Sequence, residues 1–231
     1  EAEEMSAQAT VLQPNNPAPY LNMGIALASQ NKLDEAEEIW AQIIEMDPNS
    51  SKAYSNWSNT LRAMGGFLEA KEKALKAVEL DDNDHEAWNN LANAYRDLSE
   101  SEKAEEAYRK SIEIKPDYHM AHSNLAMALN DLNRYKEATI SARYAISFQK
   151  DDAWSYSTLS QAYKGLAQYN DAYQAADKAM QLDPKEPFHY LNMADIMIMV
   201  DRLDDADAVT QQALDLNPDE PRSMMKLAEI R

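Results

Sequence analysis

The sequence repeats itself every 34 residues, and this period constrains the fold more than any other feature. One column of alanines runs through the chain at that step without insertion or deletion: Ala2, Ala36, Ala70, Ala104, Ala138, Ala172 and Ala206. A fixed period of about 20 to 50 residues is typical of architectures in which each unit packs only against its neighbours. We therefore expect a stack of equivalent units.

Each period holds two apolar stripes with helical spacing. In the first period the stripes are Tyr20, Met23 and Leu27, then Ala36, Ile39, Trp40 and Ile43. Small residues at Gly24 and Ala36 allow two helix backbones to approach each other, while Tyr20 and Trp40 fill the space between neighbours. Pro48 ends the second helix, because the residue before a proline is driven away from helical conformation. The pattern predicts pairs of antiparallel helices.

Two further columns complete the repeat. Large residues recur at Tyr20, Tyr54, Trp88, His122, Tyr156, Tyr190 and Met224, and small ones four places on at Gly24, Ser58, Ala92, Ala126, Ser160, Ala194 and Ala228. These columns resemble the tetratricopeptide repeat (TPR). The resemblance covers the whole chain, and it implies an all-α TPR α-solenoid, a right-handed superhelix of antiparallel helix pairs.

In this register the chain is a single TPR array over residues 1–231. The six full repeats are 17–50, 51–84, 85–118, 119–152, 153–186 and 187–220. Residues 1–16 are expected to hold only the second helix of a partial repeat. Residues 221–231 are either a partial repeat or a cap helix.

An asparagine column marks the candidate binding face. Its members, one step of 34 or its multiple apart, are Asn22, Asn56, Asn90, Asn124 and Asn192, with Thr158 breaking the series. Asparagine forms helices less readily than alanine, so five inside helices need a reason. A carboxamide both donates and accepts, and can pair with the N–H and C=O of an extended peptide.

The column resembles the asparagine ladder in the TPR superhelix of O-linked N-acetylglucosamine transferase, and it is similar to groove asparagines of kinesin light chains. This likeness implies that the first helices line a concave groove that holds a peptide by its main chain. Asn59 and Asn93, one turn further along, extend the polar row. The alternative is that these asparagines bond to neighbouring helices or water.

Two other features mark the same face. Arg62 and Arg96 fall in one column with Lys164, so isolated carboxylate contacts are possible, although the pattern of a TPR carboxylate clamp is absent. Met120, Trp154 and Phe188 form an apolar column, to which Leu191, Ile198 and Met199 add. This apolar surface predicts an anchor pocket for a ligand side chain, a self-association patch, or a surface covered by further chain.

Composition excludes several functions. A net charge of −18 argues against nucleic acid as a partner, although it favours a basic protein partner by electrostatic steering. The longest apolar run, Ile196 to Val200, is far too short for membrane insertion. No cysteine is present to form a disulfide or a thiolate site. The compartment stays open, with the cytoplasm favoured because the pattern of a signal peptide is absent.

No catalytic constellation is visible. The four histidines, His85, His119, His122 and His189, form no triad and no metal signature, and no phosphate-binding glycine loop occurs. We expect no enzyme activity, cofactor or metal. The sequence predicts a protein–protein interaction scaffold that binds an extended peptide segment of a partner. The alternatives are a substrate-recruiting arm of a larger glycosyltransferase-type enzyme and a self-associating assembly scaffold.

Overall fold

A computed structural model of the protein describes residues 16–219 and 221–230. The partial repeat expected over residues 1–16 therefore lies, apart from Asn16, outside the described residues. The described part of the chain forms thirteen helices and no strand, which confirms the all-α prediction.

The helices alternate between two kinds, and the starts of each kind recur at the 34-residue step. The first helices of the pairs are α2 (Pro17–Ser29), α4 (Ser51–Ala63), α6 (His85–Asp97), α8 (His119–Asp131), α10 (Ala153–Gly165), α12 (Pro187–Met199) and α14 (Pro221–Ile230). The second helices are α3 (Leu33–Met46), α5 (Phe67–Leu80), α7 (Ser101–Ile114), α9 (Tyr135–Phe148), α11 (Tyr169–Leu182) and α13 (Leu203–Leu216).

The turn inside each pair depends on one residue with a left-handed backbone. These residues are Asn31, Gly65, Ser99, Asn133, Ala167 and Asp201, again 34 apart. A residue with positive φ after a helix lets the following N–H return to a carbonyl of the last turn. The N–H of Lys32, for example, donates to the carbonyl of Leu27 over 3.0 Å. The chain therefore reverses within three residues and starts the second helix.

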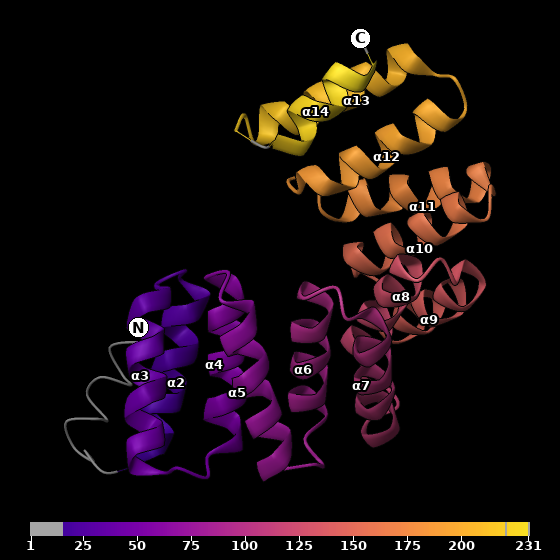
Figure 1. The fold of residues 1–231 in the computed structure, drawn as a ribbon. Helices are drawn as coiled ribbons and strands as arrows, with labels where there is room; N and C mark the ends of the chain where they lie inside the picture. The colour runs from indigo at the N-terminus through magenta and orange to yellow at the C-terminus, as the bar shows by residue number, and fades with distance from the viewer. Residues whose placement is uncertain (1–15, 220, 231) are drawn as a thin grey trace. The chain divides into compact units, whose positions relative to one another are not determined.

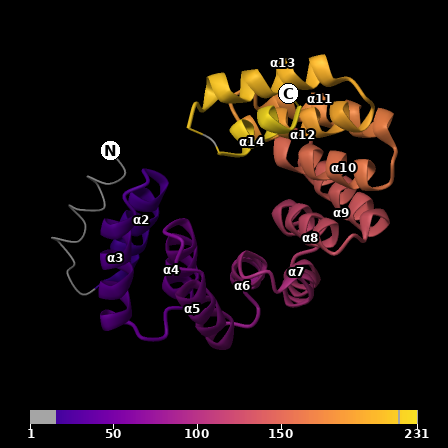
Figure 2. The ribbon, with the colours of Figure 1, turned by 45° about the horizontal axis from the view of Figure 1, so that its top comes forward.

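Two compact units make up the chain, residues 1–116 and residues 117–231. Within each unit consecutive helices pack side by side, as α2 and α3 do in Figures 1 and 2. First helices also contact the next first helix, α2 with α4 and α4 with α6 in one unit, and α8, α10, α12 and α14 in series in the other. We call the surface that these helices form the first-helix face of the unit.

Small residues set the distance between the helices of a pair. The six alanines at the 34-residue step within the described chain, Ala36, Ala70, Ala104, Ala138, Ala172 and Ala206, are all 0% exposed. In the first pair Trp40 is fully buried beside Gly24, and its indole N–H donates to Thr60 Oγ1 over 2.9 Å. The expected roles of Gly24, Ala36 and Trp40 in packing are confirmed.

Gly24→Ala should destabilise the first unit. A Cβ at this position would lie 2.5 Å from Cη2 of Trp40, so the indole would have to move. Overpacking of this kind costs about 1–3 kcal/mol, whereas alanine gains about 1 kcal/mol over glycine in a helix. We expect a net loss of up to about 2 kcal/mol in chemical denaturation followed by circular dichroism. Ser29→Ala, at an exposed position of the same helix, should change the stability by less than about 0.5 kcal/mol; a stabilised Gly24→Ala variant would contradict this account of the packing.

Candidate functional site

The asparagine column lies on the first helices, but its members differ in exposure. Asn22 is exposed, and Asn56 and Asn124 are partly buried. Asn90 and Asn192 are only 9% and 3% exposed. The column therefore does not present five equivalent carboxamides to solvent.

Three of these carboxamides already donate hydrogen bonds inside the protein. Asn56 Nδ2 donates to the carbonyl of Lys52, one turn back in its own helix, over 2.9 Å. Asn90 Nδ2 donates to Ser55 Oγ over 2.9 Å, and Asn192 Nδ2 donates to the carbonyl of Ser157 over 3.0 Å. The last two bonds join a first helix to the preceding first helix, as the alternative interpretation of the column expects. The Nδ2 donor of Asn192 is thus used inside the protein, whereas its Oδ1 acceptor has no partner within the described residues.

The polar row next to the column is bonded internally in the first unit. Asn59 Oδ1 accepts from Arg62, whose Nε pairs with a carboxylate oxygen of Asp97 on α6. Asn93 Oδ1 accepts from the hydroxyl of Tyr108 over 2.6 Å, and Arg96 also interacts with this hydroxyl. Burial raises the pKa of Tyr108 to about 12, so the phenol stays a donor. Asn59, Asn93, Arg62 and Arg96 thus belong to a network that ties α4, α6 and α7 together.

The aromatic residues predicted from the apolar column come together in the second unit. The rings of Trp154 and Phe188 stack with centroids 5.1 Å apart and an interplanar angle of 23°, and Trp154 remains 42% exposed. His189 packs edge-on against Trp154, is fully buried, and hydrogen-bonds through Nδ1 to Ser157 Oγ over 2.7 Å. Burial lowers the pKa of His189, so its imidazole is neutral at pH 7. Trp154 and Phe188 form a fixed aromatic platform on the first-helix face.

The other residues of the predicted apolar column differ in burial. Leu191 is 8% exposed, whereas Met120 and Met199 are 45% and 56% exposed. Two adjoining cavities open on this face, one lined in part by Met199 and the other by Leu191, whereas Met120 lines neither. We call them together the second-unit groove.

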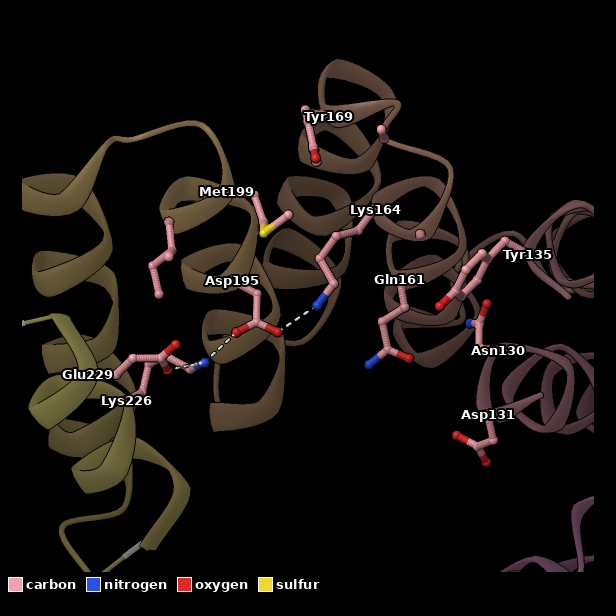
Figure 3. Close-up of a pocket in the computed structure, with 13 residues that line it drawn as sticks. Asn130, Asp131, Tyr135, Gln161, Lys164, Tyr169, Asp195, Met199, Lys226 and Glu229 are labelled. Atoms are coloured by element: carbon pink, nitrogen blue, oxygen red, sulfur yellow. Dashed lines mark hydrogen bonds and ion pairs between the residues drawn. The ribbon is translucent and has the colours of Figure 1, made fainter. Parts of the chain in front are cut away.

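The larger cavity has a volume of about 620 Å³ and is lined from α8, α10, α12 and α14, with Tyr135 at the start of α9 and Tyr169 at the start of α11 (Figure 3). The smaller one, of about 420 Å³, is lined by α10, α12 and α14. Four residues line both: Gln161, Asp195, Lys226 and Glu229. Phe188 and Asn192 line the smaller cavity, so the aromatic platform and the asparagine column meet there.

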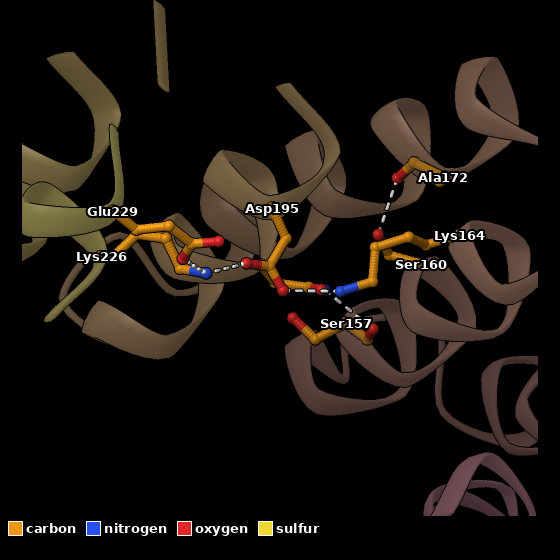
Figure 4. A network of polar contacts seen from close by, with 8 residues as sticks. Ser157, Ser160, Lys164, Ala172, Asp195, Lys226 and Glu229 are labelled. Carbon is orange, nitrogen blue, oxygen red and sulfur yellow. Dashed lines mark hydrogen bonds and ion pairs between the residues drawn. The ribbon is translucent and has the colours of Figure 1, made fainter. Parts of the chain in front are cut away.

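A charge network holds α14 against α12 at the centre of the groove (Figure 4). Asp195 Oδ2 accepts from Lys164 Nζ over 2.6 Å, and Asp195 Oδ1 pairs with Lys226 Nζ over 2.7 Å. Lys226 also pairs with Glu229 over 3.0 Å. Burial alone would raise the pKa of Asp195, but the hydrogen bonds and charges of the two lysines outweigh it and hold the pKa of this carboxyl below its usual value. Both oxygens of Asp195 are therefore occupied at neutral pH.

Two groove asparagines keep a buried acceptor without a donor. Asn130 Nδ2 donates to the carbonyl of Thr158 over 3.0 Å, just as Asn192 Nδ2 donates to that of Ser157. Within the described chain, Oδ1 of Asn130 and Oδ1 of Asn192 are buried and have no hydrogen-bond partner. A buried acceptor without a donor costs about 1–3 kcal/mol. The hydrogen-bonding capacity of these two oxygens is therefore left unused by the described residues.

Sequence reasoning missed Asn130, Gln161, Asp195, Arg222, Met225, Lys226 and Glu229 as groove residues. The repeat held a signal for most of them. Asn130 falls in the column of Arg62, Arg96 and Lys164, and Lys226 occupies the asparagine column one repeat after Asn192. Gln161, Asp195 and Glu229 continue the column of Asn59 and Asn93, and Arg222 continues that of Trp154 and Phe188. What the columns do not show is the pairing of Asp195 with two lysines, because these lysines come from different columns.

The described residues contain no group of three or more His, Asp or Glu that could hold a metal ion. His122, which the sequence assigns to packing, is 8% exposed and lies with its ring 5.5 Å from that of Tyr144. None of the described helices combines the length and the apolar character that a membrane crossing needs.

Asp195→Asn should loosen the attachment of α14. The change removes the carboxylate that Lys164 and Lys226 share, and two pairs with partly exposed side chains contribute about 1 kcal/mol together. We expect amides of residues 221–230 to exchange with deuterium about fivefold faster at pH 7. Glu229→Gln, which breaks only the more exposed pair with Lys226, should leave this rate nearly unchanged; equal rates in Asp195→Asn and the parent chain would contradict the role of the network.

Acid should remove the stabilisation that the Asp195 carboxylate gives to the attachment of α14. The pKa of Asp195 is lower in the folded chain than in the unfolded one, so its stabilisation is fully present above the unfolded value of about 3.9 and is lost as the pH falls through the folded value. The difference in exchange between the parent chain and Asp195→Asn should therefore disappear well below a pH of about 4. A difference that is undiminished at such a pH would show that the carboxylate charge is not its cause.

Models of the tetratricopeptide repeat family match three segments of the chain, residues 17–42, 85–118 and 155–186. A search of curated proteins by sequence found no match.

Several solved structures share the fold. A chain of the APC/C hetero-tetramer Cut9–Hcn1 is similar with a TM-score of 0.88 and 18% identity, over 98% of this chain and 45% of that one. This protein thus spans less than half the length of that chain. A thermophilic TPR protein of Thermus thermophilus has a TM-score of 0.73 and 20% identity, over 78% of this chain and 98% of its own. YrrB, described as a TPR protein with an unusual peptide-binding site, has a TM-score of 0.58 and 20% identity, over 81% of this chain and 97% of its own.

At these identities the likeness concerns the fold. Taken with the three matched segments and the packing of consecutive helix pairs, it shows that the chain carries tetratricopeptide repeats and folds as a TPR α-solenoid.

Proposed function

We propose that the second-unit groove binds an extended peptide segment of a partner protein. A TPR solenoid is a scaffold suited to protein–protein interaction, and the first-helix face of residues 117–231 offers the features that an extended chain requires. The observation that carries the proposal is the pair of buried Oδ1 acceptors on Asn130 and Asn192, which have no donor within the described chain.

The acceptors suit main-chain recognition. An extended peptide presents an N–H group at every residue other than proline, and each seeks an acceptor. The donor of each carboxamide is fixed on a carbonyl of α10, so the side chain cannot turn away without losing that bond. Asn130 and Asn192 thus act in this groove as oriented acceptors, and Asn192 is the member of the asparagine column among them.

The aromatic platform supplies affinity. Trp154 and Phe188 are stacked and partly exposed, so a ligand side chain placed on them buries apolar surface without reordering the rings. Burial of apolar surface contributes roughly 25 cal/mol per Å². Together the platform and the acceptors favour a ligand held by its backbone and anchored by one or two apolar side chains. The description of YrrB as a TPR protein with a peptide-binding site adds support by analogy of fold.

Asn130→Ala should weaken the binding of a selected peptide. A phage library of random dodecapeptides is selected on the protein, and the enriched peptide is labelled and titrated by fluorescence polarisation. Loss of one hydrogen bond of about 0.5–1.5 kcal/mol corresponds to a roughly two- to twelvefold weaker Kd. The matched control is Asn170→Ala, which removes an exposed carboxamide at the start of α11, outside the groove, and should leave the Kd unchanged.

Either of two outcomes would overturn the proposal: a library that yields no binder, or binders whose Kd is the same for Asn130→Ala and the parent chain. Sedimentation of the free protein tests the self-associating scaffold in parallel. A concentration-dependent mass that is abolished by Trp154→Ala would assign the platform to contacts between copies of the chain. A recruiting arm of a larger enzyme would retain the peptide binding described above.

A further inference from the structure

The smaller cavity of the second-unit groove contains one charged group that the charge network leaves out. Four charged side chains line this cavity: Asp195, Arg222, Lys226 and Glu229. Asp195, Lys226 and Glu229 belong to the charge network, which Lys164 in the larger cavity completes. Within the described chain, the exposed guanidinium of Arg222 has no carboxylate partner. The cations and carboxylates of the lining are equal in number, and Arg222 is the charge among them that stands outside the network.

Apolar surface lies next to this guanidinium. Phe188 and Leu191 line the cavity from α12, and Met225 lines it from α14 with 72% of its surface exposed. Arg222 and Met225 are three residues apart on one helix, a spacing that places their Cβ atoms about 5–6 Å apart on one face. A single ligand segment can therefore contact both.

The acceptor of Asn192 fixes how such a segment lies. Asn192 is 3% exposed, lines this cavity, and has an Oδ1 without a donor within the described residues. In an extended chain, side chains at positions i and i+2 point to the same side, about 6–7 Å apart. This separation matches the distance between Met225 and Arg222, and a backbone N–H of the same segment can donate to Asn192.

We propose that the cavity between α10, α12 and α14 selects a large apolar residue followed two positions later by an acidic residue, within an internal segment of a partner protein. The apolar side chain packs on Phe188, Leu191 and Met225. The carboxylate pairs with Arg222, and a main-chain N–H donates to Asn192 Oδ1. This assignment rests on the proposed peptide-binding function and adds the chemistry of the ligand to it.

The net negative charge of the protein opposes the binding of acidic residues. An observed preference for an acidic residue would therefore indicate a local cation in the cavity. Long-range attraction from a protein of charge −18 favours basic ligands. Salt at physiological strength screens that field beyond about 8 Å, whereas a contact pair at Arg222 acts at hydrogen-bond distance. A preference for acidic residues at one position therefore has to come from a local cation.

The test uses parallel selections from one phage library of random dodecapeptides, displayed with the peptide C-terminus fused to the coat protein so that no free terminal carboxylate is present. The targets are the parent chain, Arg222→Gln and Lys136→Gln. Lys136 is the matched control, an exposed cation on α9 outside the groove. The parent and Lys136→Gln should enrich peptides with Asp or Glu two positions after a large apolar residue, and Arg222→Gln should not.

An enriched peptide is then synthesised with a C-terminal amide and with Glu, Gln or Lys at the acidic position. Replacing Glu with Gln should weaken binding to the parent chain about fivefold, the upper range for an exposed ion pair, and should not change binding to Arg222→Gln. Met225→Gln should reduce the affinity for all three peptides. Arg222 and Met225 are both exposed, so the variants are expected to fold, and their melting curves are compared with that of the parent chain.

Three outcomes separate this inference from the function on which it rests. Binders that depend on Asn130 but show no acidic enrichment would overturn the inference and leave peptide binding intact. Acidic enrichment that persists in Arg222→Gln would also overturn it. Binders that depend on Arg222 and Met225 but not on Asn130 would support the cavity and overturn the role of the Asn130 acceptor.

Discussion

The close approach of two helix backbones, repeated every 34 residues, is the constraint on which the rest of the structure depends. Each described pair has an alanine at the contact with no exposed surface, from Ala36 to Ala206. A larger side chain there would separate the helices and open voids that close-packed interiors do not tolerate. Every described pair has a buried alanine at the same position and a left-handed residue at the same place in its turn, so successive first helices recur in equivalent positions within a unit. A side chain at a given position of the repeat therefore reappears at the same place on the first-helix face.

That regularity explains why asparagine can serve two purposes in one column. The carboxamide is short and has a donor at one end and an acceptor at the other. On α12 the donor closes on Ser157 of the preceding first helix, which satisfies a backbone carbonyl and fixes the side chain. The acceptor then stays in the groove at a position set by the helix contact. Aspartate could not donate to that carbonyl, so the choice of asparagine has a structural reason as well as a proposed functional one.

The sequence was sufficient to predict those features that recur in every repeat. The helix breaks, the packing of Gly24 against Trp40 and the juxtaposition of Trp154 with Phe188 all follow from columns at the 34-residue step. The charge network at Asp195 could not be predicted in this way, because Lys164, Asp195 and Lys226 occupy three different columns and meet through side-chain reach across α10, α12 and α14. The internal bonding of Asn59 and Asn93 was hidden for a similar reason: their partners, Arg62 and Tyr108, are long side chains whose direction the repeat pattern does not specify.

The exposed charges of the protein influence how fast a ligand approaches, whereas the charges inside the groove influence which ligand stays bound. Most carboxylates are exposed and act together at long range, as do Asp34 and Glu35 in the first turn of α3 and Asp204 and Asp205 in the first turn of α13. Inside the groove the carboxylates of Asp195 and Glu229 are paired with lysines, so their fields largely cancel. Arg222, which has no carboxylate partner within the described residues, then dominates at contact distance. On the assignment proposed for this cavity, a basic segment would approach fastest, but one with an acidic residue at the correct position would stay bound longest. For a segment of net positive charge, adding salt should slow association more than it speeds dissociation, because salt screens the long-range attraction and acts less on the bound contact.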